Sequence, residues 1–240
     1  MKRRIFGPRA VTEALRANAG AISVIYVTED ARQQLREIAD LAEQRKVVVD
    51  SRSSAELDAF AKGDRHQGVV AITGEYSYLS LEELLSERPD DALIVALDEI
   101  TDPHNFGAIV RSAVALGAHG LITLKHRAAP VTPVVVRASA GATEHARIAR
   151  VSNLAQTIER LVDEGFSALG LAAEGSVDIA SARSDGPMLL VVGSEGRGLR
   201  RLVREHCTAL VHIPMAGPIE SLNASVAAGI ALYALRAPQP

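Results

Sequence analysis

The sequence predicts an α/β protein with a large domain built on a parallel sheet and a smaller α/β domain before it. Two observations predict this class. Short apolar, β-branched runs recur along the 240 residues, with helical patterns between them. The runs are apolar nearly throughout, which is typical of parallel strands whose two faces are both covered. Hydrophobic residues make up 48% of the chain, enough for a globular core.

In the first third of the chain, three β-branched runs predict strands: ISVIYV at 22–27, KVVV at 46–49 and GVVAIT at 68–73. Helical patterns lie before and between them, at 8–18, 31–45 and 53–61. We therefore expect a small α/β domain at 1–75. The next stretch, 74–91, is polar and ends in Pro89-Asp90-Asp91, which favours a linker at 76–90 with a short helix at 80–87.

Beyond the linker, five more apolar runs predict strands and four segments predict helices. The strands are ALIVAL (92–97), GLITL (120–124), ALGLAA (168–173), MLLVV (188–192) and ALVHI (209–213). The helices are 106–117, 152–164, 198–205 and 222–236. This alternation predicts a larger parallel-sheet domain at 91–240.

The last helix, 222–236, has two distinct sets of side chains. Val226, Ile230 and Tyr233 form an apolar stripe at helical spacing, which most simply predicts a buried face. The rest of its surface is small, so that another helix can approach closely. The small residues are Ala224, Ala227, Ala228 and Ala231.

The net charge of −3 does not indicate nucleic-acid binding, but the distribution of charge does. Between His104 and Arg150 there are six Lys or Arg and one acid, Glu144. Between Arg197 and Arg204 there are four Arg and no acid. A locally basic face predicts a footprint for RNA or DNA. A solvated surface with chance clustering is the alternative.

Several classes of protein and site are disfavoured. Cys207 is the only cysteine, so no disulfide or thiolate zinc site can form within one chain. The histidines show no metal-ligand spacing, and we expect no metal. No apolar run reaches the roughly 18 residues that span a bilayer, and the basic N-terminus lacks an apolar signal core. These features predict a cytoplasmic protein without a membrane segment.

Ligands of open parallel sheets bind at the carboxyl ends of strands, and the first unusual strand end here is ALDEITDPHNFGAIVRSA. Asn105 and Arg111 lie on the helix that follows this strand. A helix cap and a surface salt bridge are the simpler interpretations of the two residues. They can converge on one ligand only if the pocket wraps around the start of the helix.

The second unusual strand end is LLVVGSEGRGL, in which glycines follow a strand directly. Gly193 and Gly196 can bring backbone N–H groups close to a ligand. The loop matches neither the dinucleotide pattern nor a P-loop. Glu195 would repel a pyrophosphate, so NAD and ATP are disfavoured. A tight strand-to-helix turn is the simpler interpretation.

The third unusual strand end is HIPMAGPIESLNASVAAGIALYALR, which carries two prolines, a glycine and a polar cluster. A plain strand-to-helix connection needs one capping residue, and either Ser221 or Asn223 can supply it. The surplus polar groups, including Glu220, indicate a site.

Together the three motifs resemble the SpoU/TrmH family of RNA ribose 2'-O-methyltransferases, within the knotted SPOUT class. The resemblance carried by DPHNFGAIVRSA, LLVVGSEGRGL and IPMAGPIESLNASVAAGIALY covers about 91–240. It implies a deep trefoil knot, a rare exception to the rule against threading. It also implies that the knotted segment binds S-adenosylmethionine. The implied cofactor residues are Ala172, Gly193, Gly196, Ile213 and Leu222.

The same resemblance assigns the catalytic and substrate site to Asn105, Arg111, Glu195, Ser221 and Asn223. Residues 1–75, with FGPRAVTEAL and RHQGVV, look like the family's substrate-binding module. That module favours the subgroup that methylates a guanosine of large-subunit (23S-type) ribosomal RNA. The resemblance further implies a homodimer whose interface includes the last helix.

Three alternatives stay open at this point. The substrate could be transfer RNA, or the chain could be a catalytically silent RNA-binding homologue. A dinucleotide-dependent oxidoreductase is the third alternative, although its glycine fingerprint is absent.

Overall fold

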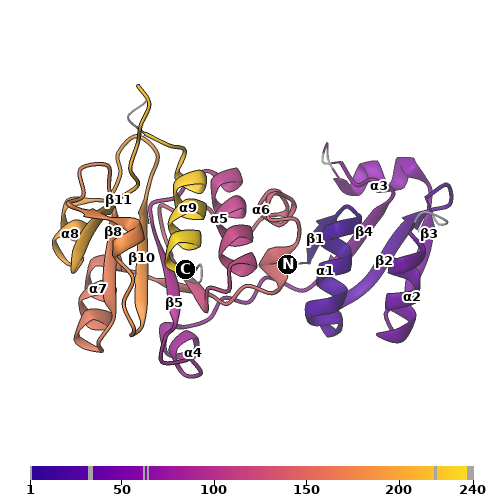
Figure 1. Ribbon diagram of the computed structural model, residues 1–240. Coiled ribbons are helices and arrows are strands. Elements are labelled where there is room, and N and C mark those ends of the chain that lie inside the picture. Colours follow the sequence, from indigo (N-terminus) through magenta and orange to yellow (C-terminus); the bar gives the residue numbers. More distant parts are fainter. Residues whose placement is uncertain (1, 32–34, 62, 64, 219–220, 237–240) are drawn as a thin grey trace. The chain divides into compact units, whose positions relative to one another are not determined.

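The computed structural model describes residues 2–31, 35–61, 63, 65–218 and 221–236, which form two compact units (Figure 1). Unit 1 contains Met1–Ser77 together with Val131–His145. Unit 2 contains Tyr78–Pro130 and Ala146–Pro240. The chain therefore passes between the units three times, and not once through a single linker.

Unit 1 is built on a four-stranded sheet. Its strands are β1 (Arg3–Phe6), β2 (Ile22–Thr28), β3 (Val49–Arg52) and β4 (Val69–Thr73), and their order is β1-β4-β2-β3. β2 and β3 are parallel, whereas β4 is antiparallel to both β1 and β2. Its helices are α1 (Pro8–Asn18), α2 (Arg36–Gln44), α3 (Ser54–Ala61) and α6 (Pro133–Ala138), with short 3-10 turns at η1 (Ala19–Ala21) and η2 (Ala142–Glu144). The mixed α/β class expected for the N-terminal part is confirmed.

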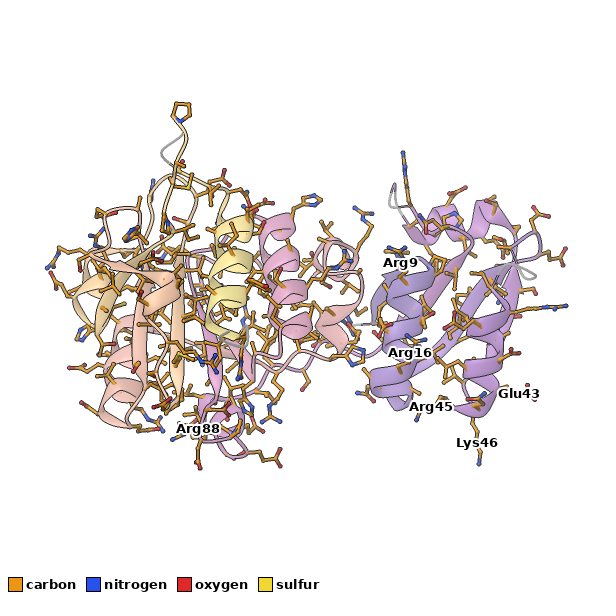
Figure 2. The ribbon with its side chains drawn as sticks, viewed as in Figure 1. Arg9, Arg16, Glu43, Arg45, Lys46 and Arg88 are labelled. Carbon is orange, nitrogen blue, oxygen red and sulfur yellow. The ribbon has the colours of Figure 1, made fainter. Side chains whose placement is uncertain are left out.

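The strand expected at 46–49 begins instead at Val49, because a turn occupies the preceding residues. Lys46 has a φ of 58°, in the left-handed region that ends many helices. Its N–H donates to the Glu43 carbonyl (3.0 Å), and the Val47 N–H donates to the Ala42 carbonyl (2.8 Å). Figure 2 shows Lys46 pointing away from the unit beside the end of α2, where a cation suits the helix dipole.

Residues 131–145 are anchored in unit 1 by close packing and by the ion pair of Arg3 with Glu144. Arg3 donates two hydrogen bonds to the carboxylate of Glu144 (2.8 and 2.7 Å), and both side chains are nearly buried. Gly141 has a φ of 87°, and a Cβ there would lie 2.8 Å from the Cβ of Glu13 on α1. α6 packs on β1 in the same unit. The expected division at 75 and 91 did not foresee this segment.

Unit 2 is built on a seven-stranded sheet in which every pair of neighbours is parallel, as expected. The strands are β5 (Leu93–Asp98), β6 (Gly120–Leu124), β7 (Ile148–Val151), β8 (Ser167–Leu171), β9 (Val177–Asp178), β10 (Met188–Gly193) and β11 (Ala209–His212). Their order is β7-β6-β5-β10-β8-β11-β9. β5 and β10 are therefore central, and their carboxyl ends lie next to each other.

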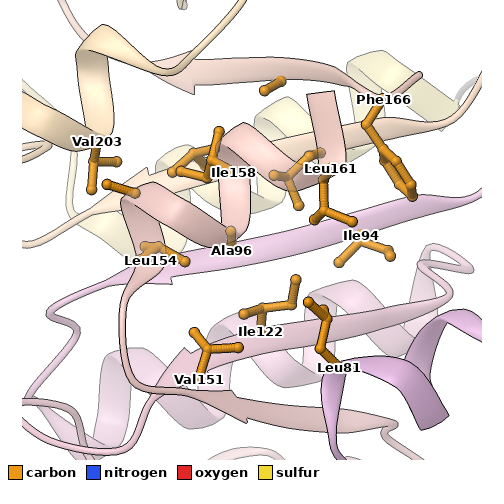
Figure 3. Close-up of a cluster of buried hydrophobic side chains, with 14 of the residues drawn as sticks. Leu81, Ile94, Ala96, Ile122, Val151, Leu154, Ile158, Leu161, Phe166 and Val203 are labelled. Carbon is orange, nitrogen blue, oxygen red and sulfur yellow. The ribbon is translucent and has the colours of Figure 1, made fainter. Parts of the chain in front are cut away.

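Helices cover both faces of this sheet. They are α4 (Leu81–Leu85), α5 (Pro103–Ala115), α7 (Leu154–Asp163), α8 (Arg201–Glu205) and α9 (Ala224–Arg236), with a 3-10 turn at η3 (Ile179–Ser181). On one face, Leu154, Ile158 and Leu161 of α7 pack with Ile94 and Ala96 of β5 in the core (Figure 3). On the other face, α5 and α9 lie side by side (Figure 1). None of the helices in the described ranges is long and apolar enough to cross a membrane.

From Tyr78 onward, the residues expected as a linker contribute to unit 2. Leu79 forms a bridge with Ala149 next to β7, and Leu81 and Leu84 of α4 are buried in the core cluster of the sheet. The short helix expected there is confirmed, but its apolar face is used for packing. A polar composition therefore did not separate this segment from the domain that follows.

The prediction that Val226, Ile230 and Tyr233 form a buried face of α9 is wrong within this chain. These side chains are 50%, 40% and 64% exposed. The small residues provide the buried face instead, because Ala228 and Ala231 let α9 approach α5 closely. The helix is thus inverted relative to the expected orientation.

Candidate active site

Three neighbouring strands of unit 2 bring together loops that are far apart in the sequence. β10, β8 and β11 are adjacent and parallel, so their carboxyl ends lie about 5 Å apart along one edge. Gly193 ends β10, Ala172 follows β8 and Ile213 follows β11. The Ala172 N–H donates to the Val211 carbonyl (2.9 Å), which ties two of the ends together. The structure therefore gathers these three expected cofactor residues at one edge.

The glycine loop after β10 folds back on itself. The Gly198 N–H donates to the Ser194 carbonyl (2.9 Å). A Cβ built on Gly193 would lie only 2.2 Å from the carbonyl carbon of Gly198, so no larger residue fits at 193 without moving backbone. Gly196 has a φ of 82° and is exposed at the tip. The loop is thus a compact backbone cradle whose peptide groups can reach a ligand.

Asp98 contacts both ends of this loop, Gly193 through strand pairing and Arg200 through hydrogen bonds. It ends β5 opposite Gly193, and its carboxylate accepts hydrogen bonds from the Arg200 backbone N–H (2.8 Å) and Nε (2.6 Å). The Asp98 side chain is fully buried, so the arginine compensates a charge that would otherwise be costly. Sequence reasoning did not assign a role to this pair. The available signal was an aspartate that ends an otherwise apolar strand.

Three of the expected catalytic side chains form one hydrogen-bonded cluster. Asn105 Nδ2 donates to Glu195 Oε2 (3.1 Å). Asn223 Nδ2 donates to Asn105 Oδ1 (2.9 Å) and to Glu195 Oε2 (3.2 Å). Their positions in the sequence, on α5, in the glycine loop and before α9, are up to 118 residues apart. The structure thus joins the three motifs at the level of individual atoms.

Each asparagine of the cluster is held by the helix that it precedes or begins. Asp102 is the N-cap of α5 and accepts from the N–H groups of His104 and Asn105, so the simpler interpretation of Asn105 as the cap is wrong. Asn105 instead lies in the first turn, where it is buried. Asn223 Oδ1 accepts from the Ser225 N–H (2.9 Å) at the start of α9. Asn223, and not Ser221, therefore caps the last helix.

The remaining expected residues are near the cluster in sequence but do not join it. Arg111 is exposed on α5, and no side chain in the described ranges forms an ion pair with it. The simpler interpretation, a surface salt bridge, therefore lacks a partner there. Ser221 is exposed and Leu222 is half-buried, and no described residue forms a hydrogen bond with the Ser221 hydroxyl. Glu220 lies outside the described residues.

The described groups indicate which chemistry the site can support. No three His, Cys, Asp or Glu side chains in the described ranges are grouped so as to hold a metal ion. Burial raises the pKa of the Cys207 thiol from about 9 to about 12, helped by the nearby charge of Asp98, so Cys207 is not an activated nucleophile. What the edge offers is a backbone cradle beside a carboxylate and two amides. Arg111, unpaired in the described ranges, lies further along the same helix as Asn105. Such a set can bind an extended organic ligand and orient a hydroxyl group.

Comparison with known protein families matches the two parts of the chain separately. Residues 92–233 match the SpoU rRNA methylase family, and residues 4–79 match the RNA 2'-O ribose methyltransferase substrate-binding domain. A Pseudomonas putida 23S rRNA (guanosine-2'-O-)-methyltransferase is 40% identical over 234 residues, which cover 96% of this chain and 94% of that protein. A Bacillus subtilis protein assigned to the TrmH family and named as a putative tRNA/rRNA methyltransferase is 38% identical over 232 residues, which cover 95% of this chain and 93% of that protein.

Solved structures agree with these matches. An rRNA methyltransferase from Sinorhizobium meliloti with bound AdoMet superposes with a TM-score of 0.79 at 29% identity, covering 98% of this chain and 87% of that one. The SpoU methyltransferase AviRb from Streptomyces viridochromogenes, in complex with AdoMet, gives 0.78 at 30% identity, covering 98% and 89%. With the site formed by all three motifs, the chain belongs to the SpoU family of RNA methyltransferases.

Proposed function

We propose that this protein transfers a methyl group from S-adenosylmethionine to a ribose 2'-hydroxyl, and that its substrate is a guanosine of large-subunit ribosomal RNA. The observation that carries the proposal is the cluster of Asn105, Glu195 and Asn223 beside the glycine loop. It unites residues from all three motifs that resemble the family. A silent RNA-binding homologue would have no need to retain this arrangement.

The cofactor fits the edge formed by β10, β8 and β11. S-adenosylmethionine supplies an electrophilic methyl group on a sulfonium. Backbone groups at Ala172, Gly193 and Ile213 lie on adjacent strand ends. Because Gly193 has no side chain, the backbone of Gly198 can pack directly against it and close the loop. Gly196 and Leu222 belong to the loops on either side. We assign these five residues to cofactor binding.

The reaction requires help with the attacking hydroxyl, which is a weak acid. As the methyl group is transferred, negative charge develops on the 2'-oxygen and must be stabilised. Arg111 is exposed on α5 without an acidic partner in the described ranges, so its charge is available for the oxygen and for an adjoining phosphate. Arginine stays protonated and is a poor base. The proton therefore leaves through a phosphate or water.

The polar cluster orders the groups around the reacting hydroxyl. Glu195 Oε2 accepts from both asparagine amides, which fixes the carboxylate and the orientation of both amides. Its other oxygen has no donor in the described ranges and is available to a hydroxyl of the substrate. Ser221, two residues before Asn223, is assigned to the same site by the family resemblance.

Large-subunit ribosomal RNA is the preferred substrate because of two similarities. The Pseudomonas putida relative, named for this activity, matches over almost the full length of both chains. Residues 4–79 match the substrate-binding domain of ribose methyltransferases. Transfer RNA is the alternative, since the Bacillus subtilis relative is named for both classes of RNA.

A homodimer and a knot complete the proposal. Val226, Ile230 and Tyr233 form an exposed apolar stripe on α9, and such stripes mark protein interfaces. We infer that the stripe packs against a second copy of the chain.

We also infer the trefoil knot from the family resemblance. After β11 the chain goes back across the sheet, so that α9 packs against α5 and β10, and this path is compatible with a knot.

The cofactor assignment is tested by calorimetry in the presence of EDTA. Binding heat with S-adenosylmethionine or its demethylated product is expected, because the site needs no metal. Absence of heat up to millimolar cofactor would contradict the assignment.

The substrate assignment is tested by mapping 2'-O-methyl groups in ribosomal and transfer RNA from cells with and without the gene. Loss of one methyl group from a guanosine of large-subunit RNA is the expected result. A loss confined to transfer RNA would select the alternative substrate.

A further inference from the structure

Half of the ten cations in the two basic runs of the sequence form ion pairs within the structure. Between 104 and 150, and between 197 and 204, five arginines of unit 2 have acidic partners. The pairs are Arg127 with Glu99, Arg147 with Glu87, Arg200 with Asp98, Arg201 with Glu205, and Arg204 with Glu174. The sequence runs therefore overstate the charge that is available to a ligand.

Three other cations of unit 2 have no such partner among the described residues. Arg111, Lys125 and Arg197 are exposed, and within the described ranges their side chains have no acidic partner, ring contact or hydrogen bond. Arg111 already has a place in the proposed reaction. Lys125 and Arg197 have no role in it.

Lys125 and Arg197 lie on the same edge of the sheet as the catalytic cluster. Lys125 follows the last residue of β6, and Arg197 lies in the loop after β10. β5, which leads into Asn105, is the strand between β6 and β10. The ends of β6 and β10 are two strand spacings apart, about 10 Å. The two free cations therefore belong to the strand ends on either side of β5, the strand that leads into α5 and Asn105.

No acid at these strand ends forms an ion pair with Lys125 or Arg197 in the described residues. Asp98 is bonded to Arg200, and Glu99 is paired with Arg127 (3.1 Å). The Asp102 carboxylate caps α5. Glu195 is bonded to two asparagines. Asp98 and Glu99 are therefore neutralised by arginines. Asp102 and Glu195 accept hydrogen bonds from neutral groups and keep their charge, but neither forms an ion pair with Lys125 or Arg197. Exposed cations without an acidic partner are suited to bind the phosphate groups of a polyanion.

We propose that Lys125 and Arg197 bind RNA phosphates on the two sides of the methyl-accepting nucleotide. This inference rests on the proposed function, because it takes RNA as the ligand of this edge. The two residues position the RNA strand and do not touch the reacting atoms. Their removal should therefore weaken RNA binding and leave the rate of the bound complex unchanged.

The opposite edge of the same sheet offers a matched control. Arg88 precedes β5, where Figure 2 shows it beside α4, and its guanidinium lies 5.0 Å from the centroid of the Phe166 ring. Arg160, near the end of α7, pairs with Glu82 (2.8 Å) and Glu164 (2.9 Å). Arg88→Gln with Arg160→Gln removes the same charge as Lys125→Gln with Arg197→Gln. Only the double variant Lys125→Gln with Arg197→Gln removes the charge from the catalytic edge.

The experiment compares the full-length wild type with both double variants. Binding of a short fluorescein-labelled single-stranded RNA is measured from about 50 to 200 mM salt, where each lost phosphate contact lowers the slope of log K against log salt by about 0.7. Methylation is measured on ribosomal RNA from cells that lack the gene. For Lys125→Gln with Arg197→Gln we expect a slope reduced by about 1.4, KM raised about tenfold and kcat within twofold of wild type. The control should keep the wild-type slope and KM.

Three outcomes of the binding and methylation measurements would overturn the inference. These are an unchanged salt slope in the variant of the catalytic edge, equal effects in both double variants, and a fall in kcat without a rise in KM. A loss of calorimetric cofactor affinity would also overturn it, because the two cations would then serve the cofactor. If the wild type methylates neither ribosomal nor transfer RNA, the proposed function fails, whereas the salt slopes of RNA binding still decide whether Lys125 and Arg197 bind phosphates.

Discussion

At the scale of single residues, Arg111 is the sharpest test of the reaction. If it stabilises the attacking oxygen, Arg111→Ala should lower turnover by about 10²–10³, the effect of removing one oxyanion donor. Arg111→Lys should recover only part of this loss, because an ammonium keeps the charge without the two-pronged geometry. Single-turnover methylation with saturating cofactor measures both variants.

Cofactor binding is the control for Arg111, because a sulfonium is positive and gains nothing from a nearby guanidinium. Calorimetric affinity should therefore change little in either variant. Near-normal turnover in Arg111→Ala would remove Arg111 from the active site. It would leave a surface arginine whose loss changes stability by at most about 1 kcal/mol.

Cys207 gives a prediction about pH. Its thiol pKa is raised from about 9 to about 12 in the folded protein, chiefly by burial. The neutral thiol therefore persists in the native state where an unfolded chain would ionise. Its contribution to stability is complete below pH 9 and is lost as the pH rises from 9 towards 12. Native protein at pH 8.5 should resist iodoacetamide and react after urea denaturation. Rapid alkylation of the native protein would contradict the burial.

Sequence reasoning could identify the polar residues that lie within a recognisable motif. Asn105, Glu195 and Asn223 stand in three motifs, and the structure joins them. Asp98 and Arg200 could not be paired from sequence, because 102 residues separate them and the contact depends on which strands are neighbours. Strand order is a property of the folded sheet, and the apolar runs alone do not encode it.

At the scale of elements, the glycine loop should tolerate no side chain at 193. Gly193→Ala would place a Cβ 2.2 Å from the backbone of Gly198 and force the loop apart. We expect at least a tenfold loss of cofactor affinity in calorimetry. Gly186→Ala is the matched control, because a Cβ there has nothing within 4 Å. Equal affinity of both variants and the wild type would show that the loop does not shape the cofactor site.

The exposed stripe of α9 is predicted to hold two copies together. Tyr233→Glu should convert the dimer to a monomer, measured by sedimentation, since burying a carboxylate in an apolar interface is costly. The monomer should keep its helical circular dichroism, because Tyr233 is 64% exposed in the single chain. Leu202→Glu is the control. Leu202 is a 52% exposed residue of α8, and its variant should stay dimeric. A monomeric wild type would contradict the proposal.

Two element-scale expectations depended on information that periodicity does not contain. The stripe of α9 has the same spacing whether it faces a core or a partner, so the pattern predicted burial but not what buries it. The sequence pattern did not predict β7, because Arg150 interrupts the apolar run of this short strand. β7 is an edge strand, and edge strands carry charges that interrupt the pattern of a central strand.

At the scale of the whole molecule, the sequence predicted the two α/β parts but not how the chain is shared between them. Composition shows a boundary where polarity changes, as at 74–91. It does not show that 131–145, which follows an apolar strand of unit 2, packs in unit 1. That assignment depends on the ion pair of Arg3 with Glu144 and on the close approach of Gly141 to α1, two contacts between distant parts of the sequence.

This division makes a prediction for truncated proteins. A chain beginning at Tyr78 should fold and bind cofactor, because it keeps the whole of unit 2. It should lose most activity on ribosomal RNA, because the match to a substrate-binding domain lies in the deleted part. It should also bind a hydrophobic dye, since Val135 and Val136, 0% and 1% exposed in the intact protein, lose their cover. Undiminished methylation of full-length RNA would show that unit 1 does not read the substrate.

A second truncation, beginning at Asp90, separates the loss of unit 1 from damage to unit 2. It also removes Leu81 and Leu84, which are 8% and 0% exposed in the core of the parallel sheet. Loss of a buried leucine costs about 2–5 kcal/mol, so this shorter chain should unfold at clearly lower urea than the chain that begins at Tyr78. Equal urea midpoints would mean that 78–89 is a linker after all. A lower midpoint for the shorter chain would place the start of the methyltransferase domain before α4.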